Sequence, residues 1–164
     1  MSETLLSKAA VLERLPDHPA VKAMLAWKPD ALLDAKFDRG ELTLTVAAEQ
    51  IRAAAATVRA AGYNFFEDVT AVDWFPSSPR FQLSYHIVSQ TYKERIRLRV
   101  LLDGDAPSVE SITSVWPSAN FYEREVFDLF GIGFEGHPNL RRIMMPDDWQ
   151  GHPLRKDYPV EGYR

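Results

Sequence analysis

The segment RIRLRV, residues 95–100, alternates strictly between arginine and an apolar side chain. Successive side chains of an extended strand point to opposite faces of a sheet, so the three arginines share one face while Ile96, Leu98 and Val100 share the other. The chain must therefore contain a sheet that buries one of its faces. We expect the arginine face to be the solvated or helix-flanked side of an antiparallel strand, and a partner-binding face is the alternative.

Other segments have the composition and spacing of strands. They are residues 32–37, 41–46, 65–75 and 81–87. The first two flank Asp38-Arg39-Gly40, a glycine-containing turn of hairpin length. Residues 108–115 are either a further strand of the same sheet or an irregular edge.

Helical patterns surround these strands. They cover residues 5–15, 20–27 and 48–61, and a last helix is expected from Pro117, which suits a first-turn position. Its apolar stripe consists of Tyr122, Val126, Leu129 and Phe130, and Gly131 ends it. Together these elements predict an α+β domain of two layers, with a mostly antiparallel or mixed sheet packed on helices.

The character of the chain changes after Gly131. Five of the eight glycines and four of the eleven prolines lie from this residue onward, and no helical or strand period persists for more than a few residues. The segment still carries large apolar side chains that require burial. These are Leu140, Ile143, Met144, Met145, Trp149, Leu154 and Tyr158. We therefore predict a body over residues 1–134 and an extended, irregular tail over residues 135–164 that docks on a partner.

Composition excludes several classes of protein. The chain contains no cysteine, which rules out disulfides, iron–sulfur ligation and cysteine nucleophiles. Its net charge is -4 and its acidic residues are spread evenly, which argues against a dedicated nucleic-acid binder. Residues 1–20 match neither a signal peptide nor a transit peptide, and no stretch approaches the roughly 20 apolar residues of a membrane span. We expect a protein that is soluble or held at a membrane through partners.

The tail contains Gly-His-Pro twice, at residues 136–138 and 151–153, which raises the question of chemistry. A zinc site would use His137, His152, Asp147 and Asp148. The proline after each histidine favours an extended backbone and keeps the pair off a common helix face. Hydrogen-bonded turn histidines are the simpler interpretation, and an independent metal-dependent hydrolase built on these four residues is the alternative.

Glu125 and Asp128, three residues apart on the last helix, have a spacing that suits acid–base catalysis or a di-metal site. No second helix with Glu-x-x-His accompanies them, and Arg124 is placed to pair with Asp128 one turn later, so we expect a solvated or salt-bridged face. Neither a dinucleotide loop nor a Gly-x-Ser-x-Gly elbow occurs. We predict no catalytic, cofactor-binding or metal-binding residues. Nucleic-acid binding through the arginine strand and the aromatic tail is a third hypothesis.

Two groups of motifs carry a family resemblance. The first is ANFYEREVFDLFGI, residues 119–132, whose signature residues are Glu123, Arg124, Glu125 and Asp128. The second is the succession GHP, LRRI, PDDW and GHPLRKDYP between residues 136 and 159. Over residues 119–159 the chain resembles the C subunit, also called the 30 kDa subunit, of respiratory complex I, the proton-pumping NADH:quinone oxidoreductase. A weaker similarity extends back to Asp73-Trp74, and Gln150 stands where this family is expected to have glutamate.

The resemblance implies a structural subunit of the hydrophilic arm that supports assembly and electron transfer from NADH to quinone. It implies that flavin, iron–sulfur clusters and quinone are carried by partner subunits and not by this chain. It implies packing chiefly on the D subunit, which together with the B subunit forms the quinone pocket. The B and I subunits are further expected partners, at the cytoplasmic side of a bacterial inner membrane. The tail residues expected to contact the partner are His137, Leu140, Arg141, Arg142, Met144, Met145, Asp147, Asp148, Trp149, His152, Leu154, Arg155, Lys156, Asp157 and Tyr158.

Overall fold

The computed structural model describes residues 6–162. The helices are α1 (Lys8–Arg14), α2 (Pro19–Trp27), α3 (Ile51–Ala60) and α4 (Ala119–Phe130), with 3₁₀ turns η1 (Pro29–Ala31) and η2 (Ala48–Gln50). The strands are β1 (Leu32–Asp38), β2 (Glu41–Val46), β3 (Phe65–Asp73), β4 (Phe81–Ser89), β5 (Glu94–Leu102), β6 (Ser108–Glu110) and β7 (Gly133–Glu135). Within this described range, each helix is too short or too polar to cross a bilayer.

Five strands form one mixed sheet in the order β1-β2-β5-β4-β3. β1 and β2 form the predicted hairpin, in which Asp38 pairs with Glu41 across Arg39-Gly40. Both turn residues have positive φ, which is the geometry that two-residue hairpin turns require. β2 runs parallel to β5, and β4 is antiparallel to both β5 and β3. The prediction of an α+β fold with a mixed sheet packed on helices is confirmed.

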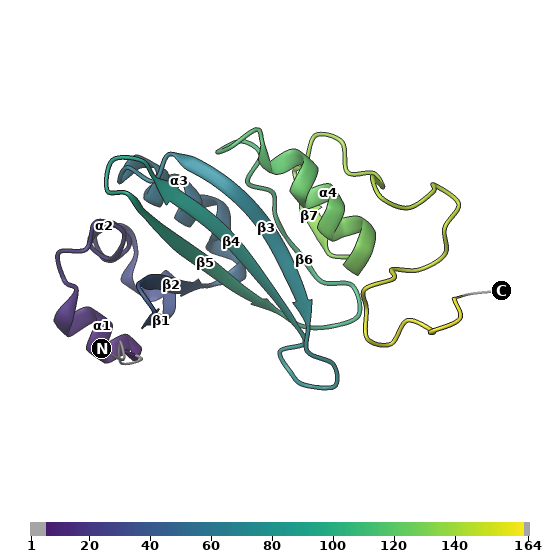
Figure 1. Cartoon of the computed structure of the whole chain (residues 1–164), viewed down its shortest axis with the longest axis horizontal. Coiled ribbons are helices and arrows are strands. Elements are labelled where there is room, and N and C mark those ends of the chain that lie inside the picture. The colour runs from purple at the N-terminus through teal and green to yellow at the C-terminus, as the bar shows by residue number, and fades with distance from the viewer. Residues whose placement is uncertain (1–5, 163–164) are drawn as a thin grey trace.

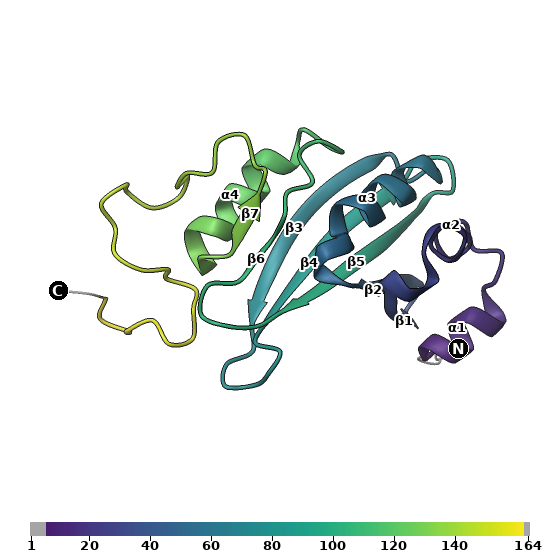
Figure 2. The same ribbon diagram turned by 180° about the vertical axis from the view of Figure 1, so that it is seen from behind.

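The alternation in β5 defines the two faces of this sheet. Its apolar side chains Ile96, Leu98 and Val100 are fully buried, and α3 lies across this face in Figure 2. The opposite face has no helix over its strands in Figure 1. On this face the arginines of β5 donate to carboxylates and hydroxyls. Arg97, for example, donates to Glu41. This face is thus the solvated, salt-bridged side that the alternation predicts.

The N-terminal helix is shorter than predicted. Leu6 forms a bridge with Phe37 of β1, because the amide of each residue donates to the carbonyl of the other, and α1 begins only at Lys8. Leu5, the predicted first helical residue, lies outside the described residues. The predicted helix 48–61 begins with the 3₁₀ turn η2 and becomes α-helical at Ile51.

One predicted strand is too long, and of the two alternatives for residues 108–115 the further strand of the main sheet is wrong. β3 ends at Asp73, two residues early, because the amide of Trp74 donates to the carbonyl of Arg80 and closes the loop to β4. Residues 108–115 add no strand to the main sheet. Only β6 is extended there, and it pairs in parallel with β7 in a separate two-stranded sheet.

The last helix and the tail meet at β7. α4 begins at Ala119, two residues after Pro117, so the proline precedes the helix instead of starting it. The helix packs beside the edge strand β3 and ends at Gly131, whose φ is 70°. β7 lies beyond Gly131, where the sequence pattern predicts no strand, and it spans the predicted boundary between residues 134 and 135. From residue 136 to 162 the chain has no helix or strand, and it runs past α4, loops outward and returns to the C-terminal end of this helix (Figure 1).

Candidate functional site

Helix α4 buries charged side chains together with apolar ones. Val126 and Phe130 of the predicted stripe are buried, but Tyr122 is 36% exposed. The side chains of Glu123 and Asp128 are fully buried instead. Carboxylates are almost never buried without partners, so the inner face of this helix is built to bind polar groups. Most of those groups come from the tail.

Asp128 holds the start of the tail. Its Oδ2 atom accepts hydrogen bonds from the amides of Ile143, Met144 and Met145 at 3.0, 2.7 and 2.8 Å. Its Oδ1 atom accepts one from Arg142 at 2.6 Å. Burial would raise the pKa of Asp128, but these hydrogen bonds outweigh burial and lower it. Asp128 therefore stays charged and fixes the backbone of residues 143–145.

The predicted pair between Arg124 and Asp128 does not form. Arg124 donates instead to the carbonyls of Arg141 and Arg142, both at 3.2 Å, so it too holds the tail. Glu125 is exposed on the outer side of the helix. The i, i+4 spacing predicted the wrong partner for Asp128. Its partner is Arg142, which lies outside the helix in the tail.

The guanidinium of Arg142 also closes a loop within the tail. Besides Asp128, it donates to the carbonyls of Trp149 and Gly151, at 2.9 and 3.0 Å. Residues 142–151 therefore form a loop whose two ends meet at the Arg142 guanidinium beside Asp128. On this loop Met144 is 62% exposed, and Ile143 and Trp149 are exposed as well. The loop thus has fixed ends and exposes three large apolar side chains beside the charged side chains of Asp147 and Asp148.

The second half of the tail caps the C-terminus of α4. The last carbonyls of a helix have no partners within it, and cations are favourable beside them. His152 Nδ1 donates to the Asp128 carbonyl at 2.9 Å, the amide of Leu154 donates to the Leu129 carbonyl at 3.0 Å, and Arg155 donates to the carbonyls of Phe130 and Gly131. Consecutive carbonyls at the end of the helix are therefore satisfied by the tail.

Both histidines of the Gly-His-Pro repeat bind the backbone of α4. The Nε2 atom of His137 lies 3.2 Å from the carbonyl of Asn120, and its Nδ1 accepts a hydrogen bond from the Asn139 amide at 3.0 Å. His152 binds near the other end of the helix. The four groups considered for zinc do not converge, and within residues 6–162 no cluster of three or more His, Cys, Asp or Glu side chains is placed to hold a metal ion.

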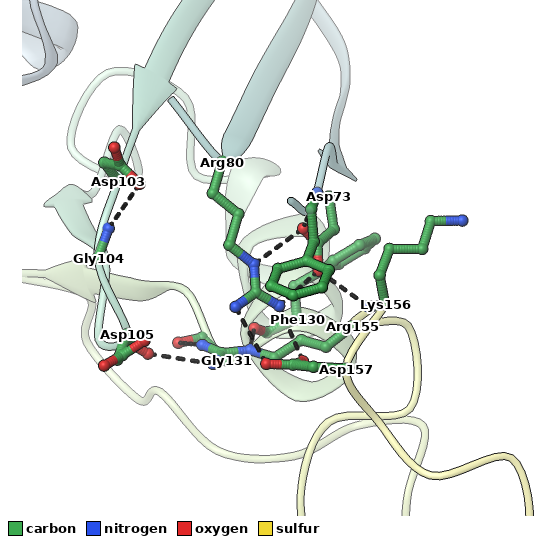
Figure 3. A network of polar contacts seen from close by, with 11 residues as sticks. Asp73, Arg80, Asp103, Gly104, Asp105, Phe130, Gly131, Arg155, Lys156 and Asp157 are labelled. Atoms are coloured by element: carbon green, nitrogen blue, oxygen red, sulfur yellow. Dashed lines mark hydrogen bonds and ion pairs between the residues drawn. The ribbon is translucent and has the colours of Figure 1, made fainter. Parts of the chain in front are cut away.

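A second anchor holds the tail to the sheet (Figure 3). Arg80 donates to Asp73 at 2.9 and 2.8 Å and to Asp157 at 3.0 and 2.8 Å, and the amide of Lys156 donates to Asp73 at 2.9 Å. The Asp73 side chain is fully buried, whereas that of Asp157 is 46% exposed. The hydrogen bonds from Arg80 lower the pKa of Asp73 to about 2 and also lower that of Asp157.

Aromatic rings and a second arginine support this anchor. The Arg80 guanidinium lies 5.0 Å from the ring centre of Phe75 and 4.7 Å from that of Phe81, within the range of cation–π attraction. Arg155 lies on the same Phe81 ring and donates to the carbonyl of Asp105 at 3.1 Å. Sequence reasoning missed Arg80 and Asp73 as site residues. The only signal was the weak family similarity at Asp73-Trp74.

The fifteen candidate tail residues fall into two sets. One set fastens the tail to the chain's own body through side chains or amides, and consists of His137, Arg142, Met144, Met145, His152, Leu154, Arg155, Lys156 and Asp157. The remaining six are Leu140, which is half-buried and packs against the core of the body, the half-buried Tyr158, and the exposed residues Arg141, Asp147, Asp148 and Trp149. Contact of either set with a partner stays a prediction.

Comparison with known sequences identifies the family. Residues 44–164 match the respiratory-chain NADH dehydrogenase 30 kDa subunit. The C subunit of NADH-quinone oxidoreductase from Roseiflexus sp. (strain RS-1) is 47% identical over 158 residues, which cover 94% of this chain and 86% of that protein. Its counterpart from Citrifermentans bemidjiense is 50% identical over 134 residues, which cover 81% of this chain and 83% of that protein.

Two solved structures share the fold. The trypsin-resistant fragment of Nqo5 has a TM-score of 0.61 and 32% identity, and the match covers 79% of this chain and 98% of the fragment. A chain of the membrane-bound sulfane sulfur reductase, an archaeal respiratory membrane complex, has a TM-score of 0.77 and 27% identity, with 88% and 86% of the two chains covered. The chain therefore belongs to the 30 kDa subunit family of respiratory-chain NADH dehydrogenase, whose bacterial relatives are the C subunits of NADH-quinone oxidoreductase.

Proposed function

We propose that this chain is a cofactor-free, non-catalytic subunit of the hydrophilic arm of a proton-translocating NADH:quinone oxidoreductase. Its tail docks on the D subunit, which contributes to the quinone pocket, and the B and I subunits are further partners. The chain supports assembly and, through it, electron transfer from NADH to quinone. It is peripheral to the bacterial inner membrane on the cytoplasmic side, and reaches the membrane only through the complex.

The observation that carries this proposal is the loop closed by Arg142. It presents Ile143, Met144 and Trp149 to the outside although each is a large apolar side chain. Exposed apolar side chains that gather on one fixed loop, rimmed by charged residues, are typical of an interaction site. Full burial of such a side chain contributes about 1.5 to 3 kcal/mol, so covering the exposed parts of three contributes several kcal/mol at most.

The anchors on α4 and on Arg80 increase what this loop can contribute to binding. Association is weakened by the entropy lost when mobile segments become ordered, and a segment already fixed in its bound conformation loses less. Asp128 and Arg142 fix both ends of the loop, and Asp157 fixes the chain that follows it. Several residues of the family signature therefore fix the conformation of the tail segment that docks on the partner.

The experiment separates assembly from turnover. A strain that lacks this protein is complemented with the Met144→Ala/Trp149→Ala double variant, and membrane activity is divided by the flavin content of the purified arm. We expect less assembled complex and wild-type turnover per complex. Leu33→Ala is the matched control, because Leu33 is also an exposed large apolar residue but lies on β1, at the end of the sheet away from the tail (Figure 1).

The opposite pattern would contradict the proposal. Normal amounts of complex combined with a loss of turnover of about tenfold or more would place the defect in a chemical step. The same result with His152→Asn would indicate that this histidine takes part in proton or quinone chemistry, instead of capping α4.

A further inference from the structure

A buried carboxyl group lies beneath the first turn of the tail. The side chain of Glu123 on α4 is fully buried. It accepts hydrogen bonds from the Ser111 hydroxyl at 2.6 Å and from the Ile112 amide at 2.7 Å. Among the residues that the structure describes, the only basic side chain within 4 Å of this carboxyl is that of His137. No arginine or lysine neutralises Glu123 there, in contrast to Asp128.

The first Gly-His-Pro turn covers this carboxyl. The side chain of His137 is fully buried, and its Nε2 lies 3.9 Å from Oε2 of Glu123. Because Nδ1 accepts a hydrogen bond from the Asn139 amide, the ring proton sits on Nε2 and is donated to the Asn120 carbonyl. Both ring nitrogens of His137 thus have other partners, and Nε2 is too far from Glu123 to hydrogen-bond it.

The remaining titratable group that faces Glu123 is Tyr85 of β4. Its hydroxyl is buried and has no hydrogen-bond partner within residues 6–162. Burial, followed by the negative charge of Glu123, raises the pKa of Tyr85. Burial likewise raises the pKa of Glu123, to about 7, although its two hydrogen bonds act in the opposite direction. At neutral pH this carboxyl therefore holds a proton in a large fraction of molecules.

We propose that packing of the tail's first turn, residues 136–138, on α4 is coupled to a proton on Glu123. The packed arrangement is called the seated state. The protonated carboxyl tolerates its buried site beneath His137. Loss of the proton favours a state in which the turn moves off α4 and solvent reaches the carboxylate. A ligand shifts an equilibrium toward the state that binds it better, and the proton is bound better by the seated state.

The sign of the pH dependence follows from the direction of the shift. The folded pKa of Glu123 lies above its ordinary value of 4.5. The proton's contribution to seating is thus fully present below pH 4.5 and is lost as the pH rises through about 7.

His137 cannot relieve the charge without disturbing the turn. A move toward the ionised carboxylate would break its bond to Asn120, and a second proton on Nδ1 would remove the acceptor for Asn139. Both responses loosen the same three-residue turn. The inference concerns the isolated chain, so it stands or falls independently of docking on the D subunit.

Trypsin cleavage after the exposed Arg141 reports on this seating, since this bond lies just beyond the turn, whereas the Arg142 side chain and the Ile143 amide are held by Asp128. The full-length chain is digested between pH 6 and pH 8.5, and each rate is divided by the rate of trypsin on a short peptide at the same pH. We expect the normalised rate of wild type to rise at least about threefold over this range, and that of Glu123→Gln, which stays neutral, to remain flat. Glu125→Gln, which replaces an exposed carboxylate on the same helix, should rise like wild type.

A flat wild-type profile, or equal slopes for wild type and Glu123→Gln, would overturn the proposal. A second measurement covers the case in which Glu123→Gln does not fold. The side-chain carboxyl carbon of Glu123 in the wild-type chain is followed by NMR from pH 4 to pH 9. A midpoint near 7 supports the coupling, and a midpoint near 4.5 rules it out.

Discussion

Replacing Asp128 by asparagine tests whether one carboxylate holds the start of the tail. The fully buried Asp128 side chain accepts four hydrogen bonds, three from the amides of residues 143–145 and one from Arg142. Asparagine has the same size but offers one acceptor oxygen and one donor NH₂ group. Whichever way the side-chain amide turns, its NH₂ group faces either the backbone amides or the guanidinium. In either orientation the buried NH₂ group of asparagine faces another hydrogen-bond donor and has no acceptor there.

The magnitude follows from the burial of the pair. Removing one partner of a buried ion pair costs about 3 to 5 kcal/mol. Arg142 is only 16% exposed, but it retains the carbonyls of Trp149 and Gly151, which favours the lower end of this range. A cost of about 3 kcal/mol shifts the equilibrium between seated and released tail about 150-fold.

Amide hydrogen exchange measures this shift directly. We expect the amides of Ile143, Met144 and Met145 to exchange about 150-fold faster in Asp128→Asn, while those of the central strand β5 keep their protection. Asp147→Asn is the matched control, because Asp147 is an exposed aspartate of the same tail. Unchanged protection of the three amides in Asp128→Asn, or an equal loss in the control, would refute the reasoning.

Two further predictions test the other anchors. Gly131→Ala should destabilise the chain by more than the roughly 1 to 2 kcal/mol of a left-handed alanine, because its Cβ would lie 2.5 Å from the ring of His152. Gly104→Ala, whose Cβ would have nothing within 4 Å, should show only this backbone cost in a thermal melt. Asp73→Asn should lower the free energy of unfolding more than Asp157→Asn, since only Asp73 is fully buried. Because its pKa is lowered to about 2, the contribution of Asp73 should be present above pH 3.8 and fade as the pH falls toward 2, which denaturant titrations of wild type and Asp73→Asn will show.

The sheet was largely predictable because strand periodicity is a local signal. The alternation of residues 95–100 and the turn at Gly40 identified β5 and the hairpin without knowledge of the rest of the fold. β6 and β7 were missed as a pair because each has three residues, too few for a period to emerge. Their pairing also depends on α4 bringing distant segments together.

The polar contacts of the tail were not predictable for the same reason. Asp128 binds Arg142 and Arg80 binds Asp157, and both partners are distant in sequence. The helical i, i+4 rule offered Arg124 as a nearer partner for Asp128, and nothing in the local pattern argued against it. Sequence did identify the tail as a segment that must lie on a surface. It could not show that much of this surface is the chain's own body.

A site-specific cross-link in the assembled complex tests the docking proposal most directly. A photoreactive amino acid is placed at Met144, on the exposed side of the loop closed by Arg142, or at Lys93, in the turn between β4 and β5 at the end of the body away from the tail (Figure 1). We expect a cross-link from position 144 to the D subunit and none from position 93. A product with the D subunit from position 93 alone, or no product from position 144 in complex that is otherwise fully assembled, would contradict the proposal.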